Sequence, residues 1–81
     1  MTIDEARQHI EVAINKILLQ KGLEKINLED NMQFLGSSIQ IDSLDLAVLL
    51  TEMEHTTKKD PFKGGFKQFN TVIELARLYA D

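Results

Sequence analysis

Residues 41–57 read Ile-Asp-Ser-Leu-Asp-Leu-Ala-Val-Leu-Leu-Thr-Glu-Met-Glu-His-Thr-Thr, and the rest of the chain is organised around them. Apolar residues recur here at i, i+3, i+4 and i+7, which predicts an amphipathic helix over residues 44–55. Asp42 is suited to cap its start, because a carboxylate accepts hydrogen bonds from the free backbone N–H groups of a first turn. Ser43 would then lie at the exposed helix N-terminus, where the helix dipole favours a negative group such as a phosphate.

The predicted helix has two apolar rows. The first row is predicted to pack in the core and comprises Leu46, Leu49, Leu50 and Met53. The second row lies on another face and comprises Leu44, Val48, Thr51 and His55, with Ala47 beside it. Its apolar part begins at Leu44, next to Ser43. We therefore expect apolar surface close to the serine.

Another helix is predicted over residues 3–21. Thr2 and Glu5 have the spacing of a capping box, and Gly22 is suited to a left-handed residue just past the helix end. The apolar stripe of this helix is Ile3, Ala6, Ile10, Ala13, Ile14, Ile17 and Leu18. Three of its polar residues are expected to face outward: Glu11, Asn15 and Lys16.

Residues 23–42 form a long connection without clear periodicity. A loop of this length in a small domain usually has a function, which here would be to present Ser43. Its apolar side chains are expected to insert into the core, and they are Leu23, Ile26, Leu28, Met32, Phe34 and Leu35. Ser37 and Ser38 are rival candidates for modification, but neither begins a strong helical pattern.

The last third of the chain contains one more helix and one ambiguous segment. Asp60-Pro61 is expected to stop the preceding helix, and Gly64-Gly65 leaves at most one helical turn over residues 66–69. The final helix is predicted to begin after Asn70 or Thr71 and to end near Tyr79. Phe62, Phe66 and Phe69 are expected in the core. The predicted fold is all-α, a small four-helix bundle with three longer helices and a short or irregular third helix, as one domain over residues 1–81.

Composition restricts the possible functions. The chain of 81 residues has no cysteine and two histidines, which excludes disulfides and makes a metal site improbable. Ten acidic and four basic residues precede Lys58, whereas three acidic and five basic residues follow from that point on, so the net charge changes from −6 to +2. The acidic front part argues against nucleic acid as a partner and favours basic protein partners.

The chain has no apolar run of the roughly 20 residues that span a bilayer, so no membrane span is expected. The first residues, Met-Thr-Ile-Asp-Glu-Ala-Arg, are polar and acidic, unlike a signal peptide. A cytoplasmic monomer is therefore expected.

The sequence Asp42-Ser43-Leu44-Asp45, followed by a helix with Glu52 and Glu54, resembles the acyl carrier protein family. Phe69-Asn70-Thr71-Val72 is similar to the start of that family's closing helix, at the usual distance from the serine. With the leading helix and long loop, the resemblance covers essentially the whole chain. It implies that Ser43 carries a 4′-phosphopantetheine arm, transferred from coenzyme A by a phosphopantetheinyl transferase with Mg²⁺ held in the transferase complex.

The resemblance also implies a carrier without catalytic activity of its own. The thiol of the arm would hold an acyl or aminoacyl group as a thioester, loaded by a ligase and presented to acyl-processing enzymes. These partners would dock on the second helix through Asp42, Leu44, Asp45, Ala47, Val48, Glu52 and Glu54. Carriers of fatty acid synthesis usually have a denser acidic run here, where this chain has Lys58 and Lys59. A carrier dedicated to a specialised pathway is therefore favoured.

Two other functions are open to this sequence. A serine nucleophile would need a positioned base, but His9 lies on the first helix and His55 lies three turns beyond Ser43 on the same helix. Catalysis is therefore disfavoured. A small helical interaction module, with Ser43 unmodified or phosphorylated, would account for the helices equally well, but it leaves the exposed apolar row beside Ser43 unexplained.

Overall fold

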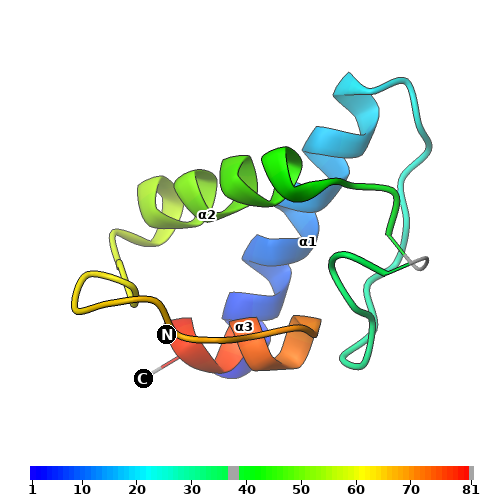
Figure 1. The fold of residues 1–81 in the computed structure, drawn as a ribbon. Helices are drawn as coiled ribbons and strands as arrows, with labels where there is room; N and C mark the ends of the chain where they lie inside the picture. The colour runs from blue at the N-terminus through cyan, green and yellow to red at the C-terminus, as the bar shows by residue number, and fades with distance from the viewer. Residues whose placement is uncertain (37–38, 81) are drawn as a thin grey trace.

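The computed structural model describes residues 1–36 and 39–80, and its elements are three α-helices joined by two irregular connections (Figure 1). Helix α1 spans Ile3–Gln20, α2 spans Ser43–Thr57 and α3 spans Val72–Tyr79. Helix α1 contacts both other helices. Within the described ranges, the only β-type pairing is an isolated antiparallel bridge between Gln33 and Thr71. The all-α prediction is thus confirmed, and no described helix is long and apolar enough to cross a membrane.

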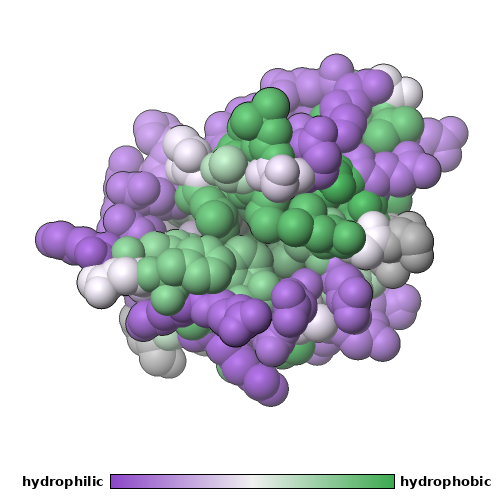
Figure 2. Space-filling view, viewed as in Figure 1, coloured by the Kyte–Doolittle hydropathy of each residue, from purple (hydrophilic) through white to green (hydrophobic). Residues whose placement is uncertain are grey.

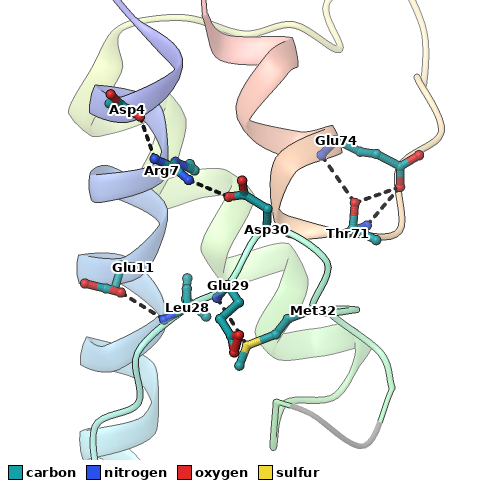
Figure 3. Close-up of polar contacts among 9 residues, drawn as sticks. All are labelled: Asp4, Arg7, Glu11, Leu28, Glu29, Asp30, Met32, Thr71 and Glu74. Atoms are coloured by element: carbon teal, nitrogen blue, oxygen red, sulfur yellow. Dashed lines mark hydrogen bonds and ion pairs between the residues drawn. The ribbon is translucent and has the colours of Figure 1, made fainter.

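Each helix begins at a capping box, in which a capping side chain and an acid three residues later bond each other's backbone N–H groups. The three pairs are Thr2 with Glu5, Asp42 with Asp45, and Thr71 with Glu74. Figure 3 shows the pair at the start of α3. The predicted starts are therefore confirmed to within one residue.

The helix ends match the sequence less closely. Helix α1 ends one residue before the predicted end, and Gly22 follows with the expected positive φ of 80°. Helix α2 extends two residues beyond the prediction, to Thr57. The next residue, Lys58, has a left-handed φ of 61°, and its N–H donates to the Glu54 carbonyl. A local left-handed residue, rather than Asp60-Pro61, therefore stops this helix.

The core is built on α1 and closed by the other two helices and the long connection. Its largest fully buried side chains are Ile10, Ile14, Leu18, Phe34, Ile39, Leu49, Met53, Val72, Leu75 and Tyr79. Two predicted core residues of α2, Leu46 and Leu50, are only partly buried, and Ile3 of α1 is exposed. Ile39 and Ile41 are also buried, although they belong to no periodic apolar pattern.

The long connection is fastened to α1 by two polar side chains that the sequence assigned to solvent. Asn15 donates to the Ile26 carbonyl (3.1 Å) and accepts from the Ile26 N–H (2.8 Å). Glu11 accepts from the Leu28 N–H at 2.9 Å (Figure 3). The outward-facing prediction for Glu11 and Asn15 is therefore wrong, because both satisfy loop backbone groups. Leu35 is also a correction, since it is 59% exposed rather than inserted.

The same connection also contacts the start of α3. The Phe34 N–H donates to the Asn70 carbonyl, and the Val72 N–H donates to the Met32 carbonyl, each at 3.0 Å. Asp30 bonds Arg7 of α1 at 2.6 Å, as Figure 3 shows. The connection is thus held between the first and last helices, which fixes the chain leading to Ser43.

The segment between α2 and α3 forms turns instead of a short helix. The Lys63 N–H donates to the Asp60 carbonyl and the Gly65 N–H to the Phe62 carbonyl, and Gly65 has a positive φ of 133°. Among the residues that the structure describes, no fourth helix forms, so the four-helix bundle is supported only in its three longer helices. Phe69 is buried as predicted, but Phe66 is 75% exposed, which corrects its placement in the core.

Candidate functional site

Ser43 is the first residue of α2 and its side chain is exposed. Asp42 caps the helix: its Oδ1 accepts from the Asp45 N–H at 2.9 Å, and Asp45 Oδ2 accepts from the Asp42 N–H at 3.2 Å. The remaining N–H groups of the first turn have no acceptor within the helix and point toward its N-terminal end. The predicted cap and the predicted position of Ser43 are both found in the structure.

A lysine at the end of α1 binds both sides of this helix start. Lys21 Nζ donates to Asp45 Oδ2 at 2.6 Å and to the Gln40 carbonyl at 3.1 Å. The pKa of Asp45 is lowered below its ordinary value, mainly by the hydrogen bond from Lys21 and secondly by the one from the Asp42 N–H. Residues 40–45 are thereby fixed relative to α1. We call this set of contacts, Lys21 with Asp45 and Gln40, the Lys21 clasp.

Apolar side chains surround the serine end of α2. Leu44 is 73% exposed and Val48 is 44% exposed, and Ala47 is exposed between them. A pocket of about 210 Å³ lies nearby and is lined by Gln33, Phe34, Leu35, Leu46, Phe69 and Asn70. The exposed apolar row that the sequence predicted beside Ser43 is present.

The acidic residues of α2 have different surroundings. Asp45 belongs to the Lys21 clasp, and Glu52 lies 3.5 Å from Lys16 of α1. Glu54 is exposed. Two of the predicted docking acids thus have cationic partners within the chain. The sequence does not indicate these pairs, because Lys21 is 24 positions from Asp45 and Lys16 is 36 positions from Glu52.

Comparison with known proteins gives one clear match. No protein-family model and no curated relative matches this chain. Among solved structures, it is similar to the solution structure of MacpD, an acyl carrier protein from Pseudomonas fluorescens involved in mupirocin biosynthesis. The two chains are 32% identical, the match covers 98% of this chain and 71% of MacpD, and the TM-score is 0.83. The chain belongs to the acyl carrier protein family.

In this family member, neither histidine is placed to activate Ser43. His9 is on α1, and His55 is exposed near the other end of α2, where it lines an open pocket with Thr51, Glu54, Lys58 and Asp60. In the described ranges, no hydrogen bond joins Ser43 to a histidine, and no group of His, Cys, Asp or Glu side chains is arranged to hold a metal ion. The rival serines Ser37 and Ser38 lie outside the described residues.

Proposed function

We propose that this acyl carrier protein is a non-catalytic carrier, one domain over residues 1–81, with Ser43 as the attachment site of 4′-phosphopantetheine. The observation that carries the proposal is the placement of Ser43, in a chain of this family, as an exposed first residue of α2 directly after its cap. When bound, the group supplies a thiol that holds an acyl or aminoacyl cargo as a thioester. The chain has no cysteine of its own.

The residues around Ser43 fit a group attached through a phosphodiester. The anionic phosphate would lie at the positive end of the α2 dipole, near N–H groups that have no intrahelical acceptor. Two carboxylates flank the serine, but Lys21 compensates the charge of Asp45, and Asp42 accepts the Asp45 N–H. Repulsion of the phosphate is therefore reduced, and the exposed hydroxyl is open to a transferase.

Partner enzymes are proposed to dock on α2. These partners are a phosphopantetheinyl transferase, a loading ligase and acyl-processing enzymes. The exposed Leu44, Ala47 and Val48 supply apolar contact, while Asp42 and Glu54 supply charge. Asp45 and Glu52 also belong to the proposed docking set. Within the part of the chain that the structure describes, each of them, unlike Asp42 and Glu54, already forms an ion pair with a lysine of the same chain.

A carrier for a specialised pathway is favoured over one for fatty acid synthesis. The residues directly after α2 are Lys58 and Lys59, where a denser acidic run would be expected. The similar chain MacpD is itself a carrier involved in the biosynthesis of mupirocin. Both observations support a dedicated carrier, and loading assays with acyl and aminoacyl ligases would identify its cargo. A carrier loaded only by enzymes of fatty acid synthesis would contradict this preference.

The assignment is tested by intact-protein mass spectrometry after incubation with coenzyme A, Mg²⁺ and a broad-specificity transferase. The parent protein should gain one phosphopantetheine mass and Ser43→Ala should gain none, while Ser38→Ala should still be loaded. Loading of Ser43→Ala would move the site to another serine. No loading of a folded parent, even with its own transferase, would favour the helical interaction module.

The docking face is tested with the loaded protein. Val48→Glu should keep the arm, because Ser43 is unchanged, but should alter the rates with partner enzymes by placing a charge in the apolar row. Val12→Glu makes the same substitution at an exposed valine of α1, outside the proposed docking set, and serves as the matched control. Unchanged kinetics of Val48→Glu with every cognate enzyme would exclude this face.

A further inference from the structure

The segment between α2 and α3 reverses the charge of the rest of the molecule. Lys58, Lys63 and Lys67 are all exposed on it, and Asp60 is its only acid before Glu74. Residues 1–57 carry a net charge of −6, so the lysines form a basic region on an otherwise acidic chain. A cluster of like charges beside an apolar surface is a feature that a complementary partner can recognise.

An exposed aromatic ring lies among these lysines. Phe66 is 75% exposed, and its ring stacks on Phe62 with centroids 5.6 Å apart and planes 18° apart. The ring also lies 6.2 Å from Phe69, which is buried. One side of Phe66 is therefore supported by other rings while most of its surface faces solvent. Aromatic side chains held in this way are typical anchors at the centre of protein interfaces.

The apolar surface continues from this ring toward α2. Figure 2 shows an apolar band over the region between α2 and the segment that follows it, with hydrophilic residues along both borders. Leu46 and Leu50 of α2, and Phe62 of the segment after it, are partly buried and pack against the core. The basic segment is thus the polar border of an apolar surface, which is the usual arrangement of an interface core and its rim.

We propose that residues 58–67, called here the lysine loop, are a docking surface for an acidic patch on a partner enzyme, with Phe66 as the apolar anchor. This inference rests on the proposed carrier function. The 15 residues of α2 separate Ser43 from the lysine loop by about 20 Å. A partner with an acidic patch about that far from its catalytic entrance would bind this carrier in one orientation, because the lysine loop is basic whereas Asp42 beside Ser43 is acidic.

A protein surface fits the lysine loop better than an anionic membrane. Three exposed lysines and one ring would bring the acidic remainder of the chain close to a uniformly negative membrane surface. That surface would repel the acidic residues within the screening length of about 8 Å at physiological salt. An enzyme surface has local patches of both signs, so it can attract the lysines and meet the acidic residues of α2 with basic groups.

The test uses the full chain labelled with ¹⁵N and titrated with an amphipathic helical peptide that has glutamates beside a leucine stripe. Amide shifts should concentrate in residues 58–67 and should weaken on raising salt from about 50 to about 200 mM. A peptide with lysines in place of the glutamates should cause none of these shifts. The double variant Lys63→Glu/Lys67→Glu should weaken binding at least about tenfold, and Phe66→Ala several-fold.

The matched control is Lys25→Glu, an exposed lysine of the long connection, which should bind the acidic peptide as the parent does. Equal binding by the double variant, or shifts outside the lysine loop, would overturn the proposal. Binding to phosphatidylglycerol vesicles without peptide binding would assign the lysine loop to a membrane instead. The intact mass of the same sample after transferase treatment reports on Ser43 separately, so a failure of the carrier function is distinguishable from a failure of the docking surface.

Discussion

Lys21 and Asp45 together determine how the backbone around Ser43 is held. Asp45 bonds the Asp42 N–H within its own capping box and Lys21 across the fold, so one carboxylate connects the helix start to α1. The second bond of Lys21, to the Gln40 carbonyl, fixes the residues that precede the cap. The serine is therefore presented by a tethered helix start, which reduces the ordering that a transferase must impose on binding.

Replacing this lysine should loosen the site without unfolding the protein. In Lys21→Met, we expect faster amide hydrogen exchange over residues 40–45 and loading of Ser43 slowed by no more than about fivefold, the range expected for a half-exposed ion pair. Lys25→Met is the control, because Lys25 is exposed and makes no ion pair with any described residue. Complete loss of loading, or unchanged exchange, would contradict a positioning role.

At the level of single residues, the sequence predicted the local part of the site and missed the tertiary part. Ser43 and Asp42 are identified by a cap and a periodic pattern within a few residues of each other. Lys21 has no such signal, because its partner is 24 positions away and any exposed lysine would look the same. Asn15 was misassigned for a similar reason: its partner is a loop backbone group that no helical pattern indicates.

Each of the three helices depends on one acid in its first turn. Glu5, Asp45 and Glu74 all have a pKa below the ordinary value, and the first cause is a hydrogen bond, from the Thr2 N–H, Lys21 and the Asn70 N–H respectively. These acids also complement the positive end of each helix dipole. Because they act at the starts of all three helices, their protonation should weaken the whole fold together.

Stability should therefore decrease in acid. Because the pKa of each acid is lower in the folded than in the unfolded protein, the unfolded chain takes up protons first as the pH falls. The stabilisation is therefore fully present above the ordinary pKa values of 4.5 and 3.8, and it is lost as the pH falls through the pKa values of the folded protein. The urea midpoint between about pH 3 and pH 7 measures this. The double variant Glu5→Gln/Glu74→Gln keeps an acceptor oxygen but no titrating group, so its midpoint should depend less on pH in this range.

Glu24→Gln, which removes an exposed acid from the long connection, is the matched control and should leave the pH dependence nearly unchanged. If the double variant loses stability in acid as steeply as the parent, the capping boxes are not the source. The helix starts were predictable because a capping box is local. The missing fourth helix and the end of α2 before Lys58 depend on turn and left-handed conformations that the pattern does not specify.

At the scale of the whole molecule, the long connection replaces a packing element. It buries Phe34, Ile39 and Ile41, bonds α1 through Asn15 and Glu11, and pairs with the start of α3. Its apolar composition indicated that it packs, but not which residues insert. Leu35, which is equally apolar, remains exposed, because the register at this point is fixed by the hydrogen bond from the Phe34 N–H to the Asn70 carbonyl rather than by hydrophobicity.

The attachment of this connection to α1 should depend on Asn15 more than on any other single polar side chain. Asn15 gives and receives one hydrogen bond with the same residue, Ile26, so Asn15→Ala leaves a part-buried N–H and carbonyl without partners. We expect a loss of about 1–3 kcal/mol in the free energy of unfolding by urea, with faster hydrogen exchange over residues 23–28.

Asn15→Asp keeps only the acceptor, so it should lose about half as much. Asn31→Ala, at an exposed loop position, should lose almost nothing. Equal losses in Asn15→Ala and Asn31→Ala would mean that Asn15 does not hold the connection, and that Ser43 is positioned without help from α1 at this point.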